Sequence, residues 1–358
     1  MPSSLNVLVC SGELSGDLIA ASYVAYLVER GVRCFGLGGE RLLDLGLEPI
    51  CQRDGISVTG LSEALGGLLP TFKVYKRLAD AIGSADAVLL CDFPEVNVRL
   101  LKIAHRRGVP VIYLAPPQAW AWRPWRYKQL LAAHFVGCLF PFSSEWYRSR
   151  GVRADWIGHP LATETPPVVR SSNHVSIMPG SRAVTVERVL PSMLNLADQM
   201  AVQNPQLRFT VVLSPELSQT MVGGLMNNRI ARVTMSQDVE MSLNRSVLAL
   251  THPGTATLHA VLRGCIPLSL CNPALLTRVL GPRLIRVEHL ALPNLILNQR
   301  CFPEFVLPVG RADELLHTAL SILNEPLSFQ AAVNEVWRSC RRNNPDASIE
   351  KALKPLFS

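Results

Sequence analysis

Short apolar runs alternate with longer helical patterns along the whole chain, and this alternation limits the possible folds more than any other feature. In the first half such runs cover residues 6–10, 87–91, 109–114 and 135–139, and in the second half 175–178, 209–213, 247–251 and 266–271. A short, continuous apolar run between helical patterns is typical of a buried strand in a parallel sheet. The sequence therefore predicts an α/β protein.

The stretch 159–174, HPLATETPPVVRSSNH, interrupts this alternation with a Pro-Pro pair and small polar residues. Such residues disfavour helix, so a domain linker is expected here. With 358 residues the chain is long enough for two domains. We predict Rossmann-like domains at 1–165 and 174–330, with parallel sheets facing an interdomain cleft, and a helical C-terminal segment at 331–358.

The composition limits the partners and the location. Hydrophobic residues make up 48% of the chain and charged residues 18%, as in a globular protein, and the formal charge of +7 favours an anionic partner such as nucleic acid, acidic lipid or a phosphorylated metabolite. No apolar run is long enough to span a bilayer and no signal peptide is evident, so a cytoplasmic protein is expected. The nine cysteines form no C-x-x-C pair, which predicts reduced thiols and no metal site.

The first apolar run leads into SGELSGD, residues 11–17, before a helical pattern. The glycines of this motif permit a tight turn and the close approach of a ligand. Ser15 or Asp17 can cap the following helix. An ordinary capped turn explains these residues but leaves Glu13 unassigned. The motif is not G-x-G-x-x-G, so no dinucleotide cofactor is predicted.

Two strand-to-helix junctions in the second half carry residues suited to an anion. One contains Gly180, Ser181 and Arg182, and the other contains Gly254, Thr255, Ala256 and Thr257. Backbone N–H groups at a helix start, joined by an arginine, can bind a phosphate or pyrophosphate. A surface turn with a solvated arginine explains one junction alone. Two similar junctions together favour a diphosphate site without metal.

Asp92 follows the apolar run 87–91, where burial raises the pKa of a carboxyl group toward that of a general base. Capping of the next helix is the alternative. Trp120, Trp122 and Trp125 lie near two arginines in a cluster that would either stack on bases or sugars or pack in a core. The sequence has no helix-turn-helix, RNP or zinc-finger signature, so nucleic acid is not an expected partner.

Nine collinear motifs resemble the lipid-A-disaccharide synthase family, glycosyltransferase family 19. They are SGELSGD (11–17), GLGGERLLDLGLE (36–48), SVTGLSEAL (57–65), CDFPEVN (91–97), WAWRP (120–124), GHPL (158–161), PGSR (179–182), GTATL (254–258), and LPNL with PEF (292–295 and 303–305). The resemblance implies a GT-B fold, in which a C-terminal nucleotide-binding domain faces an N-terminal acceptor domain. It also implies an inverting transfer from UDP-2,3-diacylglucosamine to the 6-hydroxyl of 2,3-diacylglucosamine 1-phosphate, which forms a β-1,6-linked disaccharide and releases UDP.

The resemblance also assigns roles to single residues. Asp92 is the expected base that takes the acceptor proton, and Glu13 is the fallback. The expected substrate-binding residues are Ser15, Gly16, Asp17, Asn97, Gly180, Ser181, Arg182, Gly254, Thr255, Ala256, Thr257, His259 and Asn294. Helix N-termini and Arg182 would stabilise the leaving UDP in place of a divalent cation. No cofactor is expected.

The chain departs from the family pattern at His259, where the family has a glutamate that holds the ribose hydroxyls. Neutral imidazole accepts one hydrogen bond where a carboxylate accepts two or more. Thr185 replaces another family glutamate, and Asn272-Pro273 replaces a tyrosine-arginine pair. Two alternatives therefore stay open: a UDP-sugar transferase or epimerase with a non-lipid substrate, and a non-catalytic homologue that binds nucleotide sugar or lipid.

Both implied substrates carry acyl chains, so contact with a membrane is expected. Residues 61–78 place apolar side chains before Lys73, Lys76 and Arg77, as in an interfacial segment, although a buried loop with a solvated basic face is the alternative. The expected location is peripheral, on the cytoplasmic face of the inner membrane. The resemblance leaves a homodimer open, with the segment 331–358 packing on a partner or on the first domain.

Overall fold

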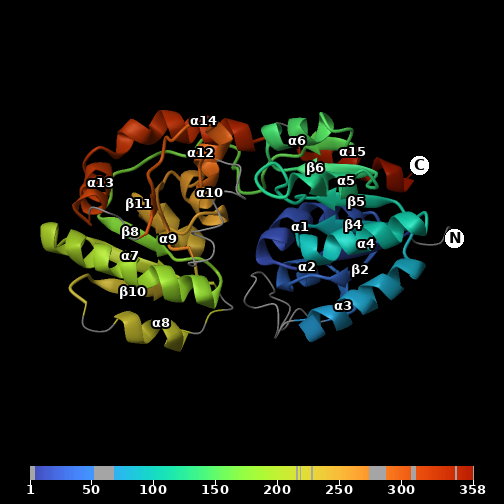
Figure 1. Cartoon of the computed structure of the whole chain (residues 1–358), viewed down its shortest axis with the longest axis horizontal. Coiled ribbons are helices and arrows are strands. Elements are labelled where there is room, and N and C mark those ends of the chain that lie inside the picture. Colours follow the sequence, from blue (N-terminus) through green and yellow to red (C-terminus); the bar gives the residue numbers. More distant parts are fainter. Residues whose placement is uncertain are drawn as a thin grey trace. The chain divides into compact units, whose positions relative to one another are not determined.

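The computed structural model describes residues 5–51, 68–214, 217, 219–226, 229–273, 288–307, 312–342 and 345–357. The chain divides into two compact units, each built around one parallel sheet (Figure 1). The first unit contains Met1–Pro160 and Arg342–Ser358, and the second contains Leu161–Arg341. The division falls near the start of the stretch 159–174, whose sequence predicts a linker.

The sheet of the first unit has the strand order β3-β2-β1-β4-β5-β6-β7, and all its strand pairs are parallel. The strands are β1 (Asn6–Ser11), β2 (Arg33–Leu37), β3 (Glu48–Pro49), β4 (Ala87–Cys91), β5 (Val111–Leu114), β6 (Phe135–Cys138) and β7 (Ala154–Trp156). The helices are α1 (Leu14–Glu29), α2 (Glu40–Asp44), α3 (Leu68–Ala81), α4 (Pro94–Arg106), α5 (Tyr127–Leu130), α6 (Pro141–Arg148) and α15 (Pro345–Phe357), with 3-10 turns at Ile82–Ser84 and Pro124–Arg126. The strand order reverses between β1 and β4.

Two apolar clusters cover the two faces of this sheet, because successive residues of a strand point to opposite sides. Leu8 and Cys10 of β1 belong to the cluster that includes α3 and α4. Val7 and Val9 belong to the cluster that includes α1, α2 and α15. Leu353 of α15 is fully buried there. The end of the chain therefore completes the core of the first unit.

The sheet of the second unit has the order β10-β9-β8-β11-β12-β13 and is also entirely parallel. The strands are β8 (His174–Met178), β9 (Arg208–Val212), β10 (Val233–Ser236), β11 (Leu248–Thr251), β12 (Ile266–Cys271) and β13 (Glu304–Val306). The helices are α7 (Ala183–Gln203), α8 (Gln219–Met226), α9 (Val239–Arg245), α10 (Thr255–Val261), α12 (Leu292–Leu297), α13 (Ala312–Asn324) and α14 (Gln330–Cys340), with a 3-10 turn at Pro326–Phe329. Here the order reverses between β8 and β11.

Every strand predicted from an apolar run is present, with ends that differ by at most two residues. The prediction of two parallel-sheet α/β domains is confirmed. Within the expected C-terminal segment 331–358, α14 lies in the second unit and α15 in the first.

The expected interfacial segment 61–78 is described only in part. Residues 61–67 lie outside the described residues, and the rest of the segment lies in α3. No helix in the described part of the chain has the length and apolar character needed to cross a bilayer.

Candidate active site

The reversal of strand order in the first unit brings together the ends of β1 and β4. Ligands of doubly wound sheets bind at such a point, outside the carboxyl ends of the strands. The link from β1 to α1 contains Gly12 and Glu13, and the link from β4 to α4 contains Asp92 and Phe93. Ser15 in the first turn of α1 donates a hydrogen bond from its Oγ to Oδ2 of Asp92 over 3.3 Å. The structure thus brings the predicted Ser15 and Asp92 into contact.

Asp92 and Phe93 both adopt the left-handed backbone conformation, with φ of 50° and 47°. Residues with a side chain rarely occupy this region, and strained backbone of this kind clusters at functional sites. Three hydrogen bonds hold the main chain of Asp92: its N–H donates to the carbonyl of Leu114 at 3.0 Å, and its own carbonyl accepts from Tyr113 at 2.9 Å and Asn97 at 2.7 Å. The turn is therefore fixed from several directions.

The environment of Asp92 raises the pKa of its carboxyl group to about 6. Burial is the largest cause and the negative charge of Glu13 is the second, while the hydrogen bonds from Phe93 N–H and Ser15 act in the opposite direction. A carboxylate with a pKa in this range is ionised at neutral pH and is still a better proton acceptor than an ordinary aspartate. The charge of the predicted Glu13 thus acts on the predicted Asp92.

The small residues of SGELSGD make room for this arrangement. A Cβ on Gly12 would lie 2.4 Å from the ring of Phe93, and one on Gly16 would lie 2.6 Å from Oγ of Ser11. The prediction that Ser15 or Asp17 caps α1 is wrong, because the helix begins at Leu14 and both residues lie inside it. Ser15 instead contacts Asp92, and the buried Asp17 accepts a hydrogen bond from the N–H of Gly39 at 3.1 Å.

Asn97 lies behind the site and is fully buried. Its Nδ2 donates to the main-chain carbonyl of Asp92 and also points to the carbonyls of Cys91 and Cys10, at 3.1 and 3.3 Å. The expectation that Asn97 contacts substrate gains no support from this position. Its contacts are those of a residue that holds the ends of β1 and β4.

The second unit has an equivalent point between β8 and β11, and the two predicted phosphate junctions lie there. Gly180 follows β8 and Gly254 follows β11, with positive φ of 110° and 132°. The N–H of His252 donates to the carbonyl of Met178 at 2.9 Å, which ties the two junctions together. Arg182 precedes α7. Burial is the main cause that lowers the pKa of His252, and the charge of Arg182 adds to it. Thr255 and Ser181 are exposed at the starts of the helices.

Thr257 differs from the three residues before it because it is fully buried. Its Oγ1 donates to the carbonyl of Gly254 at 2.7 Å and accepts from the N–H of Leu292 at 3.2 Å. It therefore holds the glycine turn against α12. Ala256, in the same turn, is only partly buried.

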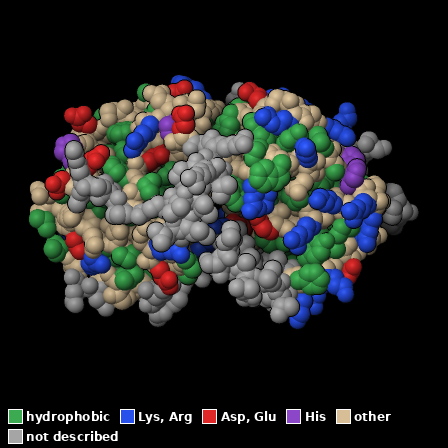
Figure 2. Space-filling view, viewed as in Figure 1, with side chains coloured by type: hydrophobic (Ala, Val, Ile, Leu, Met, Phe, Trp, Pro, Cys, Tyr) green, Lys and Arg blue, Asp and Glu red, His purple; other side chains and the backbone are tan. Residues whose placement is uncertain are grey.

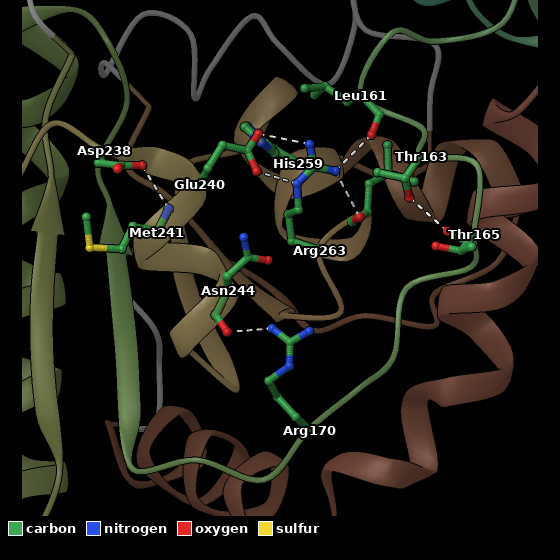
Figure 3. A network of polar contacts seen from close by, with 11 residues as sticks. Leu161, Thr163, Thr165, Arg170, Asp238, Glu240, Met241, Asn244, His259 and Arg263 are labelled. Carbon is green, nitrogen blue, oxygen red and sulfur yellow. Dashed lines mark hydrogen bonds and ion pairs between the residues drawn. The ribbon is translucent and has the colours of Figure 1, made fainter.

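His259 is part of a charged network in the second unit. Figure 3 shows Glu240 of α9 between His259 and Arg263, and Arg263 also reaches the carbonyl of Leu161. Nε2 of His259 lies 2.9 Å from Oε1 of Glu240, and Arg263 binds both oxygens of the same carboxylate. The Glu240 side chain is 49% exposed, whereas those of His259 and Arg263 are 15% and 14% exposed. The carboxylate of Glu240 thus contacts His259, the residue that stands in place of the family glutamate.

This network shifts the pKa values of both Glu240 and His259. The hydrogen bond from Arg263 is the main cause that lowers the pKa of Glu240 to about 2, with His259 adding to it. Burial lowers the pKa of His259, and Glu240 only partly opposes this shift. His259 is therefore neutral at pH 7, with one ring nitrogen directed at Glu240.

Asn294 occupies a buried site near the start of α12. Its Oδ1 accepts from the N–H groups of Cys301 and Phe302, and its Nδ2 donates to the carbonyl of Phe302 and to Glu304. These four bonds use its whole hydrogen-bonding capacity. The expected contact of Asn294 with sugar or phosphate gains no support here, and its contacts are those of a structural residue.

Sequence reasoning did not identify Tyr113, Glu240 or His252 as candidates. Tyr113 lies inside the apolar strand β5 and has the sequence signature of a core residue. Glu240 lies in α9 and His259 in α10, 19 positions later, so their contact depends on how the elements of the second unit pack. Among the described residues, no group of three or more His, Cys, Asp or Glu side chains is arranged to hold a metal ion.

Solved structures share the architecture of this chain. The UDP-GlcNAc 2-epimerase of Neisseria meningitidis, bound to UDP-GlcNAc, has a TM-score of 0.64 and 12% identity over 99% of this chain and 100% of that one. The glycosyltransferase of kitacinnamycin has a TM-score of 0.61 and 13% identity over 99% of each chain. At this identity the likeness shows the fold alone. With its two doubly wound parallel sheets, the protein has the GT-B fold.

Relatives by sequence narrow this class. The lipid-A-disaccharide synthase of Koribacter versatilis is 30% identical over 386 residues, covering 99% of this chain and 98% of that protein. The enzyme of the same name from Acidobacterium capsulatum is 29% identical over 340 residues, 86% of this chain and 84% of that one. The sequence pattern of the family described as lipid-A-disaccharide synthetase matches residues 7–339. The chain belongs to this family, whose members are glycosyltransferases that condense lipid A precursors.

Proposed function

We propose that the chain transfers the 2,3-diacylglucosaminyl group of UDP-2,3-diacylglucosamine to the 6-hydroxyl of 2,3-diacylglucosamine 1-phosphate, with inversion at the anomeric carbon, and releases UDP. The observation that carries this proposal is the strained, polar turn at Asp92. A transfer by direct displacement needs a base at the acceptor hydroxyl and a stabilised leaving group. The strand-end site of the first unit would supply the base, and that of the second unit would stabilise the leaving group.

The first unit would bind the acceptor. Asp92 takes the proton of the attacking hydroxyl, because its pKa of about 6 keeps it ionised but basic at pH 7. Ser15 and the N–H of Phe93 hydrogen-bond this carboxylate and hold it in place. Glu13 is the fallback base, and its charge helps to raise the pKa of Asp92. Gly16 and Asp17 support the loop that carries these groups.

The second unit would bind UDP. The diphosphate would lie between the starts of α7 and α10, where the first turn of each helix presents backbone N–H groups. Gly180 and Gly254 let the backbone approach the phosphates, Ser181 and Thr255 add exposed hydroxyls, and Arg182 adds a positive charge. These donors would stabilise the charge that develops on UDP without a divalent cation. The expected cleft between the domains, where donor and acceptor meet, is part of this proposal.

His259 would bind a hydroxyl of the ribose through Nδ1, since Nε2 is directed at Glu240. The hydrogen bond to Glu240 fixes the ring and its tautomer, as a carboxylate commonly does for a functional histidine. The chain would thereby keep a hydroxyl-binding group where the family has a carboxylate.

The first unit would also contact the membrane that holds the acyl chains. Figure 2 shows Lys and Arg side chains gathered over α3 and α4, which pack together. The exposed lysines and arginines of these helices are Lys73, Lys76, Arg77, Arg99, Lys102 and Arg106, with Arg107 directly after α4, and Phe72 is exposed beside them. Basic side chains next to an exposed aromatic suit an anionic bilayer surface. We place the protein on the cytoplasmic face of the inner membrane, and a homodimer stays a prediction.

The test is an assay with the two defined lipids in detergent, with the product identified by mass spectrometry. Wild-type protein should form the disaccharide and UDP, and Asp92→Asn should lose at least about 100-fold in kcat, as expected for removal of a general base. Asp44→Asn makes the same change at an exposed position of the same unit and should keep full activity. Turnover of a soluble acceptor regardless of acyl chains, or UDP binding without any transfer, would contradict the proposal.

A further inference from the structure

Two side chains converge on the main chain of Asp92, the proposed base. No sequence pattern predicts that either of them contacts this residue. The hydroxyl of Tyr113 and Nδ2 of Asn97 both donate to the carbonyl oxygen of Asp92, at 2.9 and 2.7 Å. Tyr113 comes from β5 and Asn97 from α4, so the carbonyl is held from a neighbouring strand and from the following helix.

The conformation of the turn explains why such bonds are needed. Asp92 and Phe93 are consecutive residues with positive φ, and neither is glycine. Each residue held in this region costs on the order of 1 kcal/mol or more unless its surroundings fix it. Glycine would remove the cost at Asp92 but would also remove the carboxylate. External hydrogen bonds are therefore the means by which this chain combines the turn with the side chain.

Both donors are well suited to hold a fixed geometry. Tyr113 and Asn97 are fully buried, so water does not compete for their bonds. Burial and the nearby charge of Asp92 raise the pKa of Tyr113 well above its ordinary value, so the hydroxyl keeps its proton and remains a donor. Asn97 also reaches the carbonyls of Cys10 and Cys91, which ties the turn to the ends of β1 and β4.

We propose that Tyr113 and Asn97 are positioning residues for the transfer, which aim the Asp92 carboxylate at the acceptor hydroxyl by holding the carbonyl of the same residue. The inference rests on the proposed role of Asp92 as the base. Neither residue needs to touch a substrate. Without these bonds the turn relaxes toward an ordinary conformation and the carboxylate moves from its partly buried position toward water.

The charged and titratable groups around Asp92 come from several elements. Glu13 lies in the link after β1 and Glu95 in the first turn of α4, and both raise the pKa of Asp92 by charge repulsion. Cys91 and Tyr113 have raised pKa values of their own and stay neutral at pH 7. If the carboxylate of Asp92 moves away from these groups, its pKa should fall.

The kinetic test compares Tyr113→Phe with Tyr147→Phe. Both changes remove one buried hydroxyl that donates to a main-chain carbonyl, but Tyr147 binds Pro117 instead of Asp92. We expect Tyr113→Phe to lower kcat about tenfold with KM within about twofold, because a misaimed base slows chemistry more than binding. The acid limb of its pH profile should move to lower pH. Tyr147→Phe should keep the wild-type kcat and profile.

A second measurement does not need turnover. Carbon-13 NMR of labelled aspartate carboxyl groups, with the Asp92 signal identified by its loss in Asp92→Asn, reports the titration of this group directly. Its midpoint should fall by about one pH unit in Tyr113→Phe and stay unchanged in Tyr147→Phe. Asn97→Ser, which shortens the other donor, should give the same lowering, and thermal unfolding checks that each variant is folded.

The two proposals fail in different ways. If wild-type protein makes no disaccharide, the proposed function is wrong, and the NMR titration still tests the positioning. If Tyr113→Phe and Asn97→Ser fold and Asp92 titrates in both as in wild type, the positioning role is wrong even where the transferase activity stands. Equal loss of kcat in Tyr147→Phe would also overturn it.

Discussion

At the scale of single residues, Asp92 illustrates the conflict between stability and function. The same burial that makes its carboxyl group a better base also makes its charge unfavourable in the folded chain. Ser15 and the N–H of Phe93 offset part of this cost. Residues that are selected for chemistry are commonly destabilising in this way.

We predict that Asp92→Asn makes the protein more stable at about pH 8 while abolishing transfer. The pKa is about 6 in the folded chain and near 3.8 in the unfolded chain. Stability therefore falls as pH rises from the lower to the higher value, and above both the folded chain carries a partly buried charge. Removing it should raise the free energy of unfolding by about 1–3 kcal/mol. Urea denaturation at about pH 8 measures this gain.

The control is the same measurement at about pH 4, where Asp92 is largely protonated in the folded chain and the gain should shrink. Asp44→Asn, at an exposed position of α2, should change stability by less than about 0.5 kcal/mol at either pH. An equal gain at both pH values for Asp92→Asn would mean that charge is not its cause.

Glu240 is the second residue whose role depends on a partner. We predict that Glu240→Gln weakens UDP binding by about threefold to tenfold, because His259 then loses the carboxylate that orients its ring. Stability should change by less than about 1 kcal/mol, since the carboxylate is half exposed and its ion pairs are screened. Isothermal titration with UDP measures the affinity. Glu335→Gln on α14 is the matched control, and an equal loss of affinity there would contradict the prediction.

At the scale of elements, both candidate sites are built by turns that join a buried strand to a helix. Helix α1 begins at Leu14, earlier than its sequence suggests, because the first turn packs beside Asp92 and its side chains contact groups from other elements. In the second unit, the turn before α10 depends on Gly254, whose φ of 132° no other residue adopts without strain.

We predict that Gly254→Ala abolishes UDP binding and costs about 1–3 kcal/mol of stability. A Cβ there would meet no atom within 4 Å, so the cost comes from the backbone conformation. Gly31→Ala is the control, because Gly31 ends α1 with φ of 73° and its Cβ would also meet nothing within 4 Å. It should cost about 1 kcal/mol and leave UDP affinity unchanged. Normal UDP affinity in Gly254→Ala would place the diphosphate elsewhere.

At the scale of the whole molecule, the chain returns to its first unit at the end. Helix α15 packs on the face of the sheet that α1 and α2 also cover. Lys351 of α15 and Arg342 before it form ion pairs with Asp155, at 2.8 and 3.6 Å. The first unit is therefore complete only when the last residues of the chain are in place.

We predict that Leu353→Ala destabilises the first unit by about 2–4 kcal/mol, as is usual for a fully buried leucine. Leu327→Ala, at a position that is 65% exposed in the second unit, should cost less than about 0.5 kcal/mol. Hydrogen exchange of the two units, read separately, shows where protection is lost. Loss of protection confined to the second unit in Leu353→Ala would contradict the assignment of α15.

The proposed membrane contact is also a property of the whole molecule. We predict that Lys73→Glu, Lys76→Glu and Lys102→Glu together weaken binding to vesicles with anionic lipid by at least about 100-fold, since each basic residue contributes about 1 kcal/mol. Vesicle flotation measures the bound fraction, and added salt should weaken wild-type binding in the same direction.

The matched control changes the same amount of charge in the second unit. Arg188→Glu, Arg232→Glu and Arg245→Glu are exposed there and should leave vesicle binding within about threefold of wild type. Equal losses in the two triple variants would mean that net charge, and not the surface of α3 and α4, governs the association.

The sequence predicts the interior of both sheets well and their edges poorly. The runs at 87–91 and 266–271 coincide with β4 and β12, because a strand buried on both faces must be apolar throughout. The unpredicted strands include all four edges, β3, β7, β10 and β13, which have one pairing partner each. Their short and partly polar sequences carry little periodic signal. β2 was also missed, because Arg33 and Gly36 interrupt its apolar pattern.

The sequence by itself determined the two α/β halves, the family and the residues at the strand ends, because strand periodicity and turn chemistry are local properties of the chain. Only the tertiary structure decided which of those residues reach a site. Asn97 and Asn294 proved to be buried and engaged by main-chain groups, whereas Tyr113 and Glu240 came into contact with Asp92 and His259 from distant positions. Such contacts depend on strand order and helix packing, and no local pattern encodes the distance between residues that lie far apart in the chain.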